Sequence, residues 1–107
     1  MSEDHNRHAG QGAVLLDIGG DVGALVVRAP ASLAGTEIEI RAVDATGARP
    51  THVAVLPRPT GNGLSHSAVF AELERGTYEL CRRPDGPVAL RVTITGGEVQ
   101  QADWPIG

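Results

Sequence analysis

Four histidines are the side chains of this sequence that offer the most chemistry. His5 and His8 lie three residues apart in a polar N-terminal segment, whereas His52 and His66 lie in segments typical of strands. Neutral imidazole is the commonest transition-metal ligand in proteins, so His5 and His8 are predicted as candidate ligands of a transition metal. The alternative is that all four are ordinary surface histidines.

His52 and His66 are predicted not to share a metal ion. If segments 51–56 and 64–70 form a hairpin, His66 lies opposite about Val55 and is offset from His52 by roughly 10 Å along the strand. Metal ligands lie about 2 Å from their ion, so two imidazoles at that separation cannot both reach one ion. We therefore treat His52 and His66 as candidate contacts of a ligand or partner.

Two arginines complete the set of candidate contact residues. Arg58 lies between Pro57 and Pro59, and Arg49 precedes the same stretch of chain. A guanidinium presented by a stiffened loop is suited to an acidic ligand or partner. The alternative is that both arginines are solvated loop charges.

Cys81 is the single cysteine, so the chain cannot form an internal disulfide. Strand alternation with Tyr78 and Leu80 predicts that Cys81 faces outward, beside Arg82 and Arg83. A nearby guanidinium lowers the pKa of a thiol and makes it more nucleophilic. No histidine close in sequence offers a base, and the alternative is an incidental thiol.

No other catalytic constellation emerges from the sequence. Ser65 and Ser67 flank His66, but neighbouring residues of a strand point to opposite faces, and no Gly-x-Ser-x-Gly elbow is present. The chain has no lysine, which excludes Schiff-base chemistry and a P-loop lysine. We predict no catalytic residue and no cofactor, apart from the candidate transition metal.

Charge and composition exclude further classes. The net charge is −4 and the aromatic residues are only Phe70, Tyr78 and Trp104, which argues against a nucleic-acid surface. No apolar run approaches the roughly 18 residues of a membrane span, and no apolar core of a signal peptide is seen. A cytoplasmic protein is the expectation.

The elements that must position these side chains are short strands. In segment 36–43 isoleucines alternate with charged residues, which predicts a strand with one buried and one wet face. Segment 57–63 is predicted as a long exposed loop, because proline cannot donate to a strand ladder. Segments 13–18 and 22–28 form a predicted hairpin around Gly19, Gly20 and Asp21. The predicted strands are 13–18, 22–28, 36–43, 51–56, 64–70, 77–83, 88–95 and 98–104.

The last two strands pose a register conflict. A two-residue loop at Gly96–Gly97 would pair them as a hairpin, and regular pairing would then leave Trp104 outside. A β-bulge near Gln100 and Gln101 would return Ala102 and Trp104 to the inner face, so we predict that bulge.

Together these segments predict an all-β fold, a single antiparallel β-sandwich of about seven strands over residues 13–107, preceded by a disordered tail at 1–12. A chain of 107 residues is one domain with room for one core. The predicted core comprises Val14, Leu16, Leu25, Val27, Ile38, Ile40, Val53, Val55, Phe70, Leu73, Tyr78, Leu80, Leu90, Val92, Ile94 and Trp104.

Three stretches carry a resemblance to known domains. Segments 35–40, 68–78 and 92–104 resemble transthyretin-like and carboxypeptidase regulatory-like domains through Gly35-Thr36, Gly76-Thr77 and the final Trp104. The resemblance implies a transthyretin-like or immunoglobulin-like sandwich. The opening 14–25 is similar to small bacterial proteins, some of which carry a phospholipase label. The first resemblance implies an accessory, binding or structural module, and the second a small hydrolase.

The predicted function is a non-catalytic binding or protein-interaction module, whose partner is another protein or a second copy of the chain. Unpaired sheet edges favour a homodimer. The alternatives are a metal-binding protein that uses the N-terminal histidines and a small hydrolase.

Overall fold

The computed structural model describes residues 18–43 and 50–105. Eight strands lie in these two stretches, so the predicted all-β sandwich is confirmed. The only helical turn described is the short 3-10 turn Ala31–Leu33. The strands are β1 (Val22–Ala29), β2 (Glu37–Ala42), β3 (Thr51–Ala54), β4 (Leu56–Thr60), β5 (Gly63–Glu74), β6 (Gly76–Arg82), β7 (Val88–Ile94) and β8 (Val99–Asp103).

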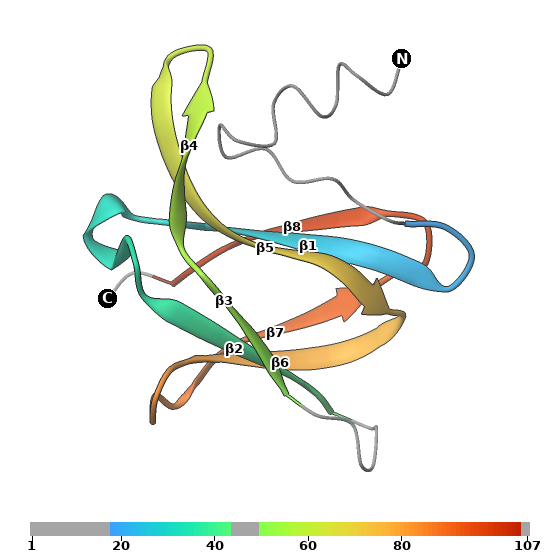
Figure 1. Cartoon of the computed structure of the whole chain (residues 1–107). Coiled ribbons are helices and arrows are strands. Elements are labelled where there is room, and N and C mark those ends of the chain that lie inside the picture. Colours follow the sequence, from blue (N-terminus) through green and yellow to red (C-terminus); the bar gives the residue numbers. More distant parts are fainter. Residues whose placement is uncertain (1–17, 44–49, 106–107) are drawn as a thin grey trace.

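The strands form two sheets that face each other (Figure 1). Sheet A has the order β4-β5-β1-β8, and sheet B has the order β3-β2-β6-β7. All neighbouring strands run antiparallel except β1 and β8, which are parallel. Within the described residues, no helix is long and apolar enough to cross a membrane.

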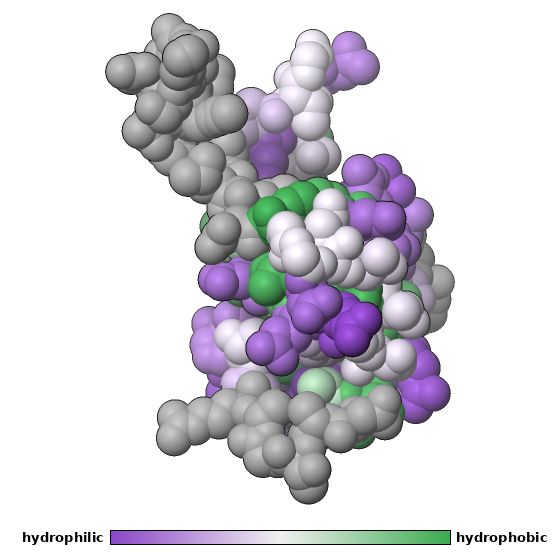
Figure 2. Space-filling model, turned by 90° about the vertical axis from the view of Figure 1, so that its right-hand side faces the viewer, coloured by the Kyte–Doolittle hydropathy of each residue, from purple (hydrophilic) through white to green (hydrophobic). Residues whose placement is uncertain are grey.

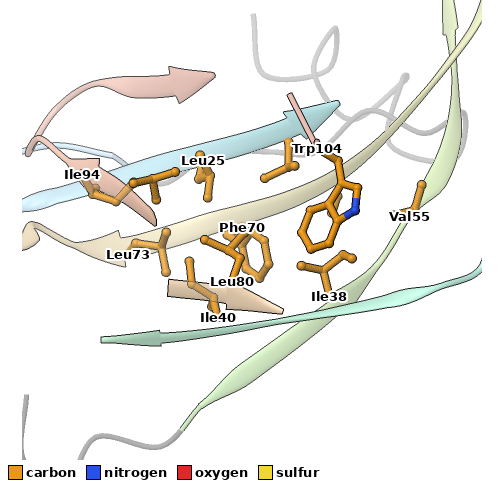
Figure 3. Close-up of a cluster of buried hydrophobic side chains, with 12 residues drawn as sticks. Leu25, Ile38, Ile40, Val55, Phe70, Leu73, Leu80, Ile94 and Trp104 are labelled. Carbon is orange, nitrogen blue, oxygen red and sulfur yellow. The ribbon is translucent and has the colours of Figure 1, made fainter. Parts of the chain in front are cut away.

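The core lies between the two sheets (Figure 3). Trp104 follows β8 in sheet A, is 7% exposed, and reaches toward Ile38 of sheet B in the close-up. Val53, Tyr78 and Leu90 are half-buried at its margin, and Val14 and Leu16 lie outside the described residues. The predicted members that are buried are Leu25, Val27, Ile38, Ile40, Val55, Phe70, Leu73, Leu80, Val92, Ile94 and Trp104, and Ala68 joins them.

The strand predicted at 51–56 is confirmed over 51–54, whereas its predicted end and the predicted loop at 57–63 are wrong. The chain crosses from sheet B to sheet A at the buried Val55, and residues 56–60 then form β4. Proline is tolerated on an edge strand where its nitrogen faces away from the neighbouring strand. The two-residue turn between β4 and β5 places Pro57 and Pro59 at such alternate positions. The prolines therefore permit an edge strand here, although they exclude a central one.

The predicted hairpin of the last two strands is also wrong, although Trp104 lies on the inner face as predicted. β7 belongs to sheet B and β8 to sheet A, where β8 lies beside β1 with Ala102 opposite Val27. Gly96 and Gly97 carry the chain between the sheets, and no bulge interrupts the β1–β8 register. Simple alternation then brings Ala102 and Trp104 inward.

The first predicted turn is confirmed, whereas its hairpin is not. Gly19 and Val22 exchange two backbone hydrogen bonds, of 2.9 and 2.8 Å, around Gly20 and Asp21. The predicted strand 13–18 lies outside the described residues except for Ile18. Both edges of β1 are already bonded, to β5 on one side and to β8 on the other.

Candidate functional site

The outer face of sheet B gathers most of the described side chains that could do chemistry. Residues directly opposite each other in an antiparallel pair share a face. Ile38, Ile40 and Leu80 point into the core, so the residues between them point outward. We call this surface the charged face; its members are Glu37, Glu39, Arg41, His52, Glu79, Cys81, Arg83 and Arg91.

The charges of this face pair with one another across the strands. Arg91 Nη2 lies 2.8 Å from Glu79 Oε2, and Arg41 Nε lies 2.6 Å from Glu39 Oε2. Arg83 lies 3.6 Å from a Glu37 oxygen and 3.9 Å from a Glu39 oxygen. The hydrogen bond to Glu39, together with its charge, raises the pKa of Arg41. Exposed pairs of this kind each contribute only about 0–1 kcal/mol, so the face is electrically balanced rather than strongly stabilising.

Cys81 lies on this face opposite Glu39, as alternation predicts, but its predicted exposure is wrong. The residue is only 4% exposed, and its Sγ accepts a hydrogen bond from Arg41 Nη2 at 3.4 Å. The guanidinium in contact therefore comes from β2 and not from Arg82 or Arg83. Strand pairing brings Arg41 closer than the chain neighbours, and sequence position alone carries no signal of this.

His52 lies on the other side of the same glutamate. It pairs with Glu39 across β3 and β2, and its Nδ1 lies 2.8 Å from Glu37 Oε1. Cys81 pairs with Glu39 from β6, so the backbones of His52 and Cys81 are two strand spacings apart, about 10 Å. This separation is too large for imidazole to take a proton directly from the thiol.

The remaining predicted contact residues lie in or beyond the other sheet. Arg58 belongs to β4, where its Nε donates to Ser67 Oγ at 2.9 Å, and partial burial lowers the pKa of Arg58. His66 belongs to β5 and pairs with Pro57, whereas His52 is in sheet B, so the two histidines are not hairpin neighbours. His5, His8 and Arg49 lie outside the described residues. Among the residues described, no group of three or more His, Cys, Asp or Glu is placed to hold a metal ion.

The end of the β4–β5 hairpin projects from the sandwich. The last residue of β1 pairs with His66, so residues 58–65 extend beyond β1 as a two-stranded ribbon, which we call the arm. The arm rises clear of the two sheets in Figure 1 and stands above the body of the molecule in Figure 2. Leu64 in the arm is 66% exposed, and Leu56 at its base is 45% exposed. Leu56 pairs with Ser67 and Leu64 with Pro59, so the two leucines lie on opposite faces of the hairpin.

The two leucines were not predicted as functional residues. Leu56 was placed at the end of a strand and Leu64 at the start of the next, and either position is compatible with a core residue. Leu64 is exposed because β5 extends beyond the end of β1, and Leu56 is exposed because it lies on the outer face of the edge strand β4. The one available signal was composition: residues 51–71 contain no aspartate or glutamate in a chain of net charge −4.

No family model matches this chain, and no curated protein matches it.

Proposed function

We propose that this protein is a non-catalytic protein-interaction module that contacts its partner through the arm. The observation that carries the proposal is the exposure of Leu64 on a ribbon that projects from the sandwich, with Leu56 exposed at the base of that ribbon. Complete burial of a leucine side chain stabilises a complex by about 1.5–3 kcal/mol, before the costs of association. A partner that covers both leucines gains that energy.

The arm is held in place by the sandwich. A two-stranded hairpin alone is marginally stable in water. Here β5 continues from the arm into the core through Ala68 and Phe70. At the base of the arm, Arg58 donates hydrogen bonds to the hydroxyl and the carbonyl oxygen of the buried Ser67. An arm anchored in this way loses less conformational entropy on binding than a free loop would.

The chemistry of the arm indicates the kind of surface that it fits. Around the leucines the segment 51–71 has arginine and histidine as its only ionisable residues. Because Leu56 and Leu64 lie on opposite faces of the hairpin, a cleft with apolar walls and an acidic rim complements it, with the walls against the leucines and the carboxylates against Arg58. The resemblance to transthyretin-like domains, which mostly serve as binding or structural modules, supports the same proposal at the level of fold.

Site-specific photo-crosslinking in the cells that make the protein tests the proposal. A photoreactive side chain at position 64 is expected to capture one discrete protein, whereas the same group at the exposed Glu72 of β5 captures none. Leu56→Ser in the same chain should weaken the capture at position 64. Equal capture at positions 64 and 72, or none at position 64, contradicts the proposal.

The captured protein then allows a quantitative test. Truncating the buried anchors of an interface commonly costs at least about tenfold in affinity. We expect the double variant Leu56→Ser with Leu64→Ser to bind the purified partner at least about tenfold more weakly than the natural chain. A Val88→Ser variant, altered at an exposed apolar residue of β7, serves as the matched control and should bind normally.

A further inference from the structure

The β7 edge of sheet B is a second candidate contact surface, because backbone N–H and C=O groups on it have no neighbouring strand among the described residues. Within the described residues, β7 is bonded to β6 on one side and to no strand on the other. The direction of its backbone groups follows from the β2–β6 ladder, where the Val43 N–H donates to the Thr77 carbonyl oxygen. Odd-numbered residues of β6 therefore bond toward β2, and even-numbered residues bond toward β7.

The same alternation continues into β7. Tyr78 pairs with Val92 and Gly76 with Ile94, so those residues of β7 direct their N–H and C=O groups at β6. Arg91 precedes Val92, and Thr93 lies between Val92 and Ile94. These two residues direct their N–H and C=O groups away from β6, toward the open edge. An edge with this arrangement is a template for an added strand.

The other edges of the sandwich are less suited to this role. In β4 the outward positions hold Pro57 and Pro59, which have no N–H to donate. β3 is four residues long, and β8 is five residues long and bonded in parallel to β1. β7 is seven residues long and has no proline.

We propose that two copies of this chain pair through their β7 strands, antiparallel and centred on Val92. This inference is independent of the arm, because it uses the opposite sheet. A two-fold axis perpendicular to the sheet requires a register centred on one residue, since opposed side chains share a face. Centring on Val92 places Arg91 opposite Thr93 of the second copy and Leu90 opposite its Ile94.

This register satisfies both the backbone and the side chains. Arg91 and Thr93 exchange four N–H···O=C bonds across the axis, because both have outward-directed groups. The half-buried Leu90 gains an apolar neighbour on the inner face. Centring on Arg91 would oppose the two arginines, and centring on Leu90 would oppose Thr93 to Pro87, which has no N–H.

Sedimentation of the purified protein over a range of concentrations measures the dimer. Thr93→Pro removes the outward donor without touching a bond to β6, and it is expected to leave only monomer. Gln101→Pro makes the same change on the edge of β8 and should leave the dimer intact. A natural chain that stays monomeric throughout, or a dimer lost with Gln101→Pro but not with Thr93→Pro, overturns the proposal.

Charge substitutions test the register itself. Because position 93 faces Arg91 of the second copy twice per dimer, Thr93→Glu should tighten the dimer about fivefold and Thr93→Arg weaken it about fivefold. Effects of the same sign for both variants contradict the register. Leu64→Ser should not change the dimer, and its loss in that variant would assign self-association to the arm instead. Native emission from Trp104 verifies that each variant is folded.

Discussion

Cys81 owes its surroundings to residues far from it in the sequence. Arg41, forty positions away, donates a hydrogen bond to its sulfur, and Glu39 lies opposite its backbone. The register shift between Leu80 and Cys81 also places Val88 opposite the cysteine. The alternation along the strand assigned Cys81 to the correct face, but the guanidinium that bonds to its sulfur comes from the neighbouring strand.

Tyr78 shows the same effect on an ionisable group. Its hydroxyl donates a 2.6 Å hydrogen bond to the Glu74 carbonyl oxygen. Burial, and then the charge of Glu74, raise the pKa of Tyr78 above its ordinary value of 10.0. The folded state therefore favours the neutral phenol. This contribution to stability is present below about pH 10 and is lost as the pH rises through the higher pKa of the folded state.

Ultraviolet titration measures this directly, because Tyr78 is the only tyrosine in the chain. We expect phenolate absorbance to appear at higher pH in the native protein than in the protein unfolded by urea. Tyr78→Phe should reduce the loss of stability above about pH 10. Coincident titration curves in the native and unfolded states would contradict the prediction.

At the scale of elements, the connection between β7 and β8 decides how the sheets join. Gly97 N–H donates to the Val22 carbonyl oxygen at 2.9 Å, and Ala24 N–H donates to the Glu98 carbonyl oxygen at 3.0 Å. The connection thus lies directly against the start of β1. A Cβ on Gly96 would meet the Gly20 carbonyl oxygen inside contact distance and Asp21 Cα at 2.8 Å.

Gly96→Ala is accordingly expected to destabilise the protein by about 1–3 kcal/mol, because backbone on both sides must move. Urea unfolding followed by Trp104 fluorescence measures the loss. Gly61→Ala, in the turn of the arm, is the matched control: its Cβ meets no atom within 4 Å, and its backbone does not need a positive φ. Equal midpoints for the two variants would show that the chain accommodates a Cβ at position 96 without cost, which contradicts the prediction.

At the scale of the whole molecule, one core joins both sheets. Leu25 and Phe70 come from sheet A, and Ile40 and Leu80 come from sheet B. Neither sheet buries its inner face without the other, so the two should unfold together.

The single tryptophan makes this testable. Trp104 is 7% exposed in the shared core, so its fluorescence reports core disruption while far-ultraviolet circular dichroism reports loss of strands. The two signals are expected to give one coincident urea transition. Separate midpoints would mean that the sheets come apart before the strands are lost.

The sequence by itself determined that this protein is an all-β sandwich and which side chains face its core. Both follow from a local property, because side chains alternate between the two faces of a strand. The pattern of a segment such as 36–43 therefore identifies its buried face, whichever strands lie beside it. The inward positions of Ile38, Ile40 and Leu80 were predicted for this reason and are confirmed.

Only the tertiary structure decided which strands are neighbours. Many pairings bury the same alternating residues equally well, and the choice depends on contacts between distant segments. β8 therefore lies beside β1 and not β7, and the prolines of β4 lie on an edge. The arm, the contact between Arg41 and Cys81 and the open edge of β7 all follow from these pairings.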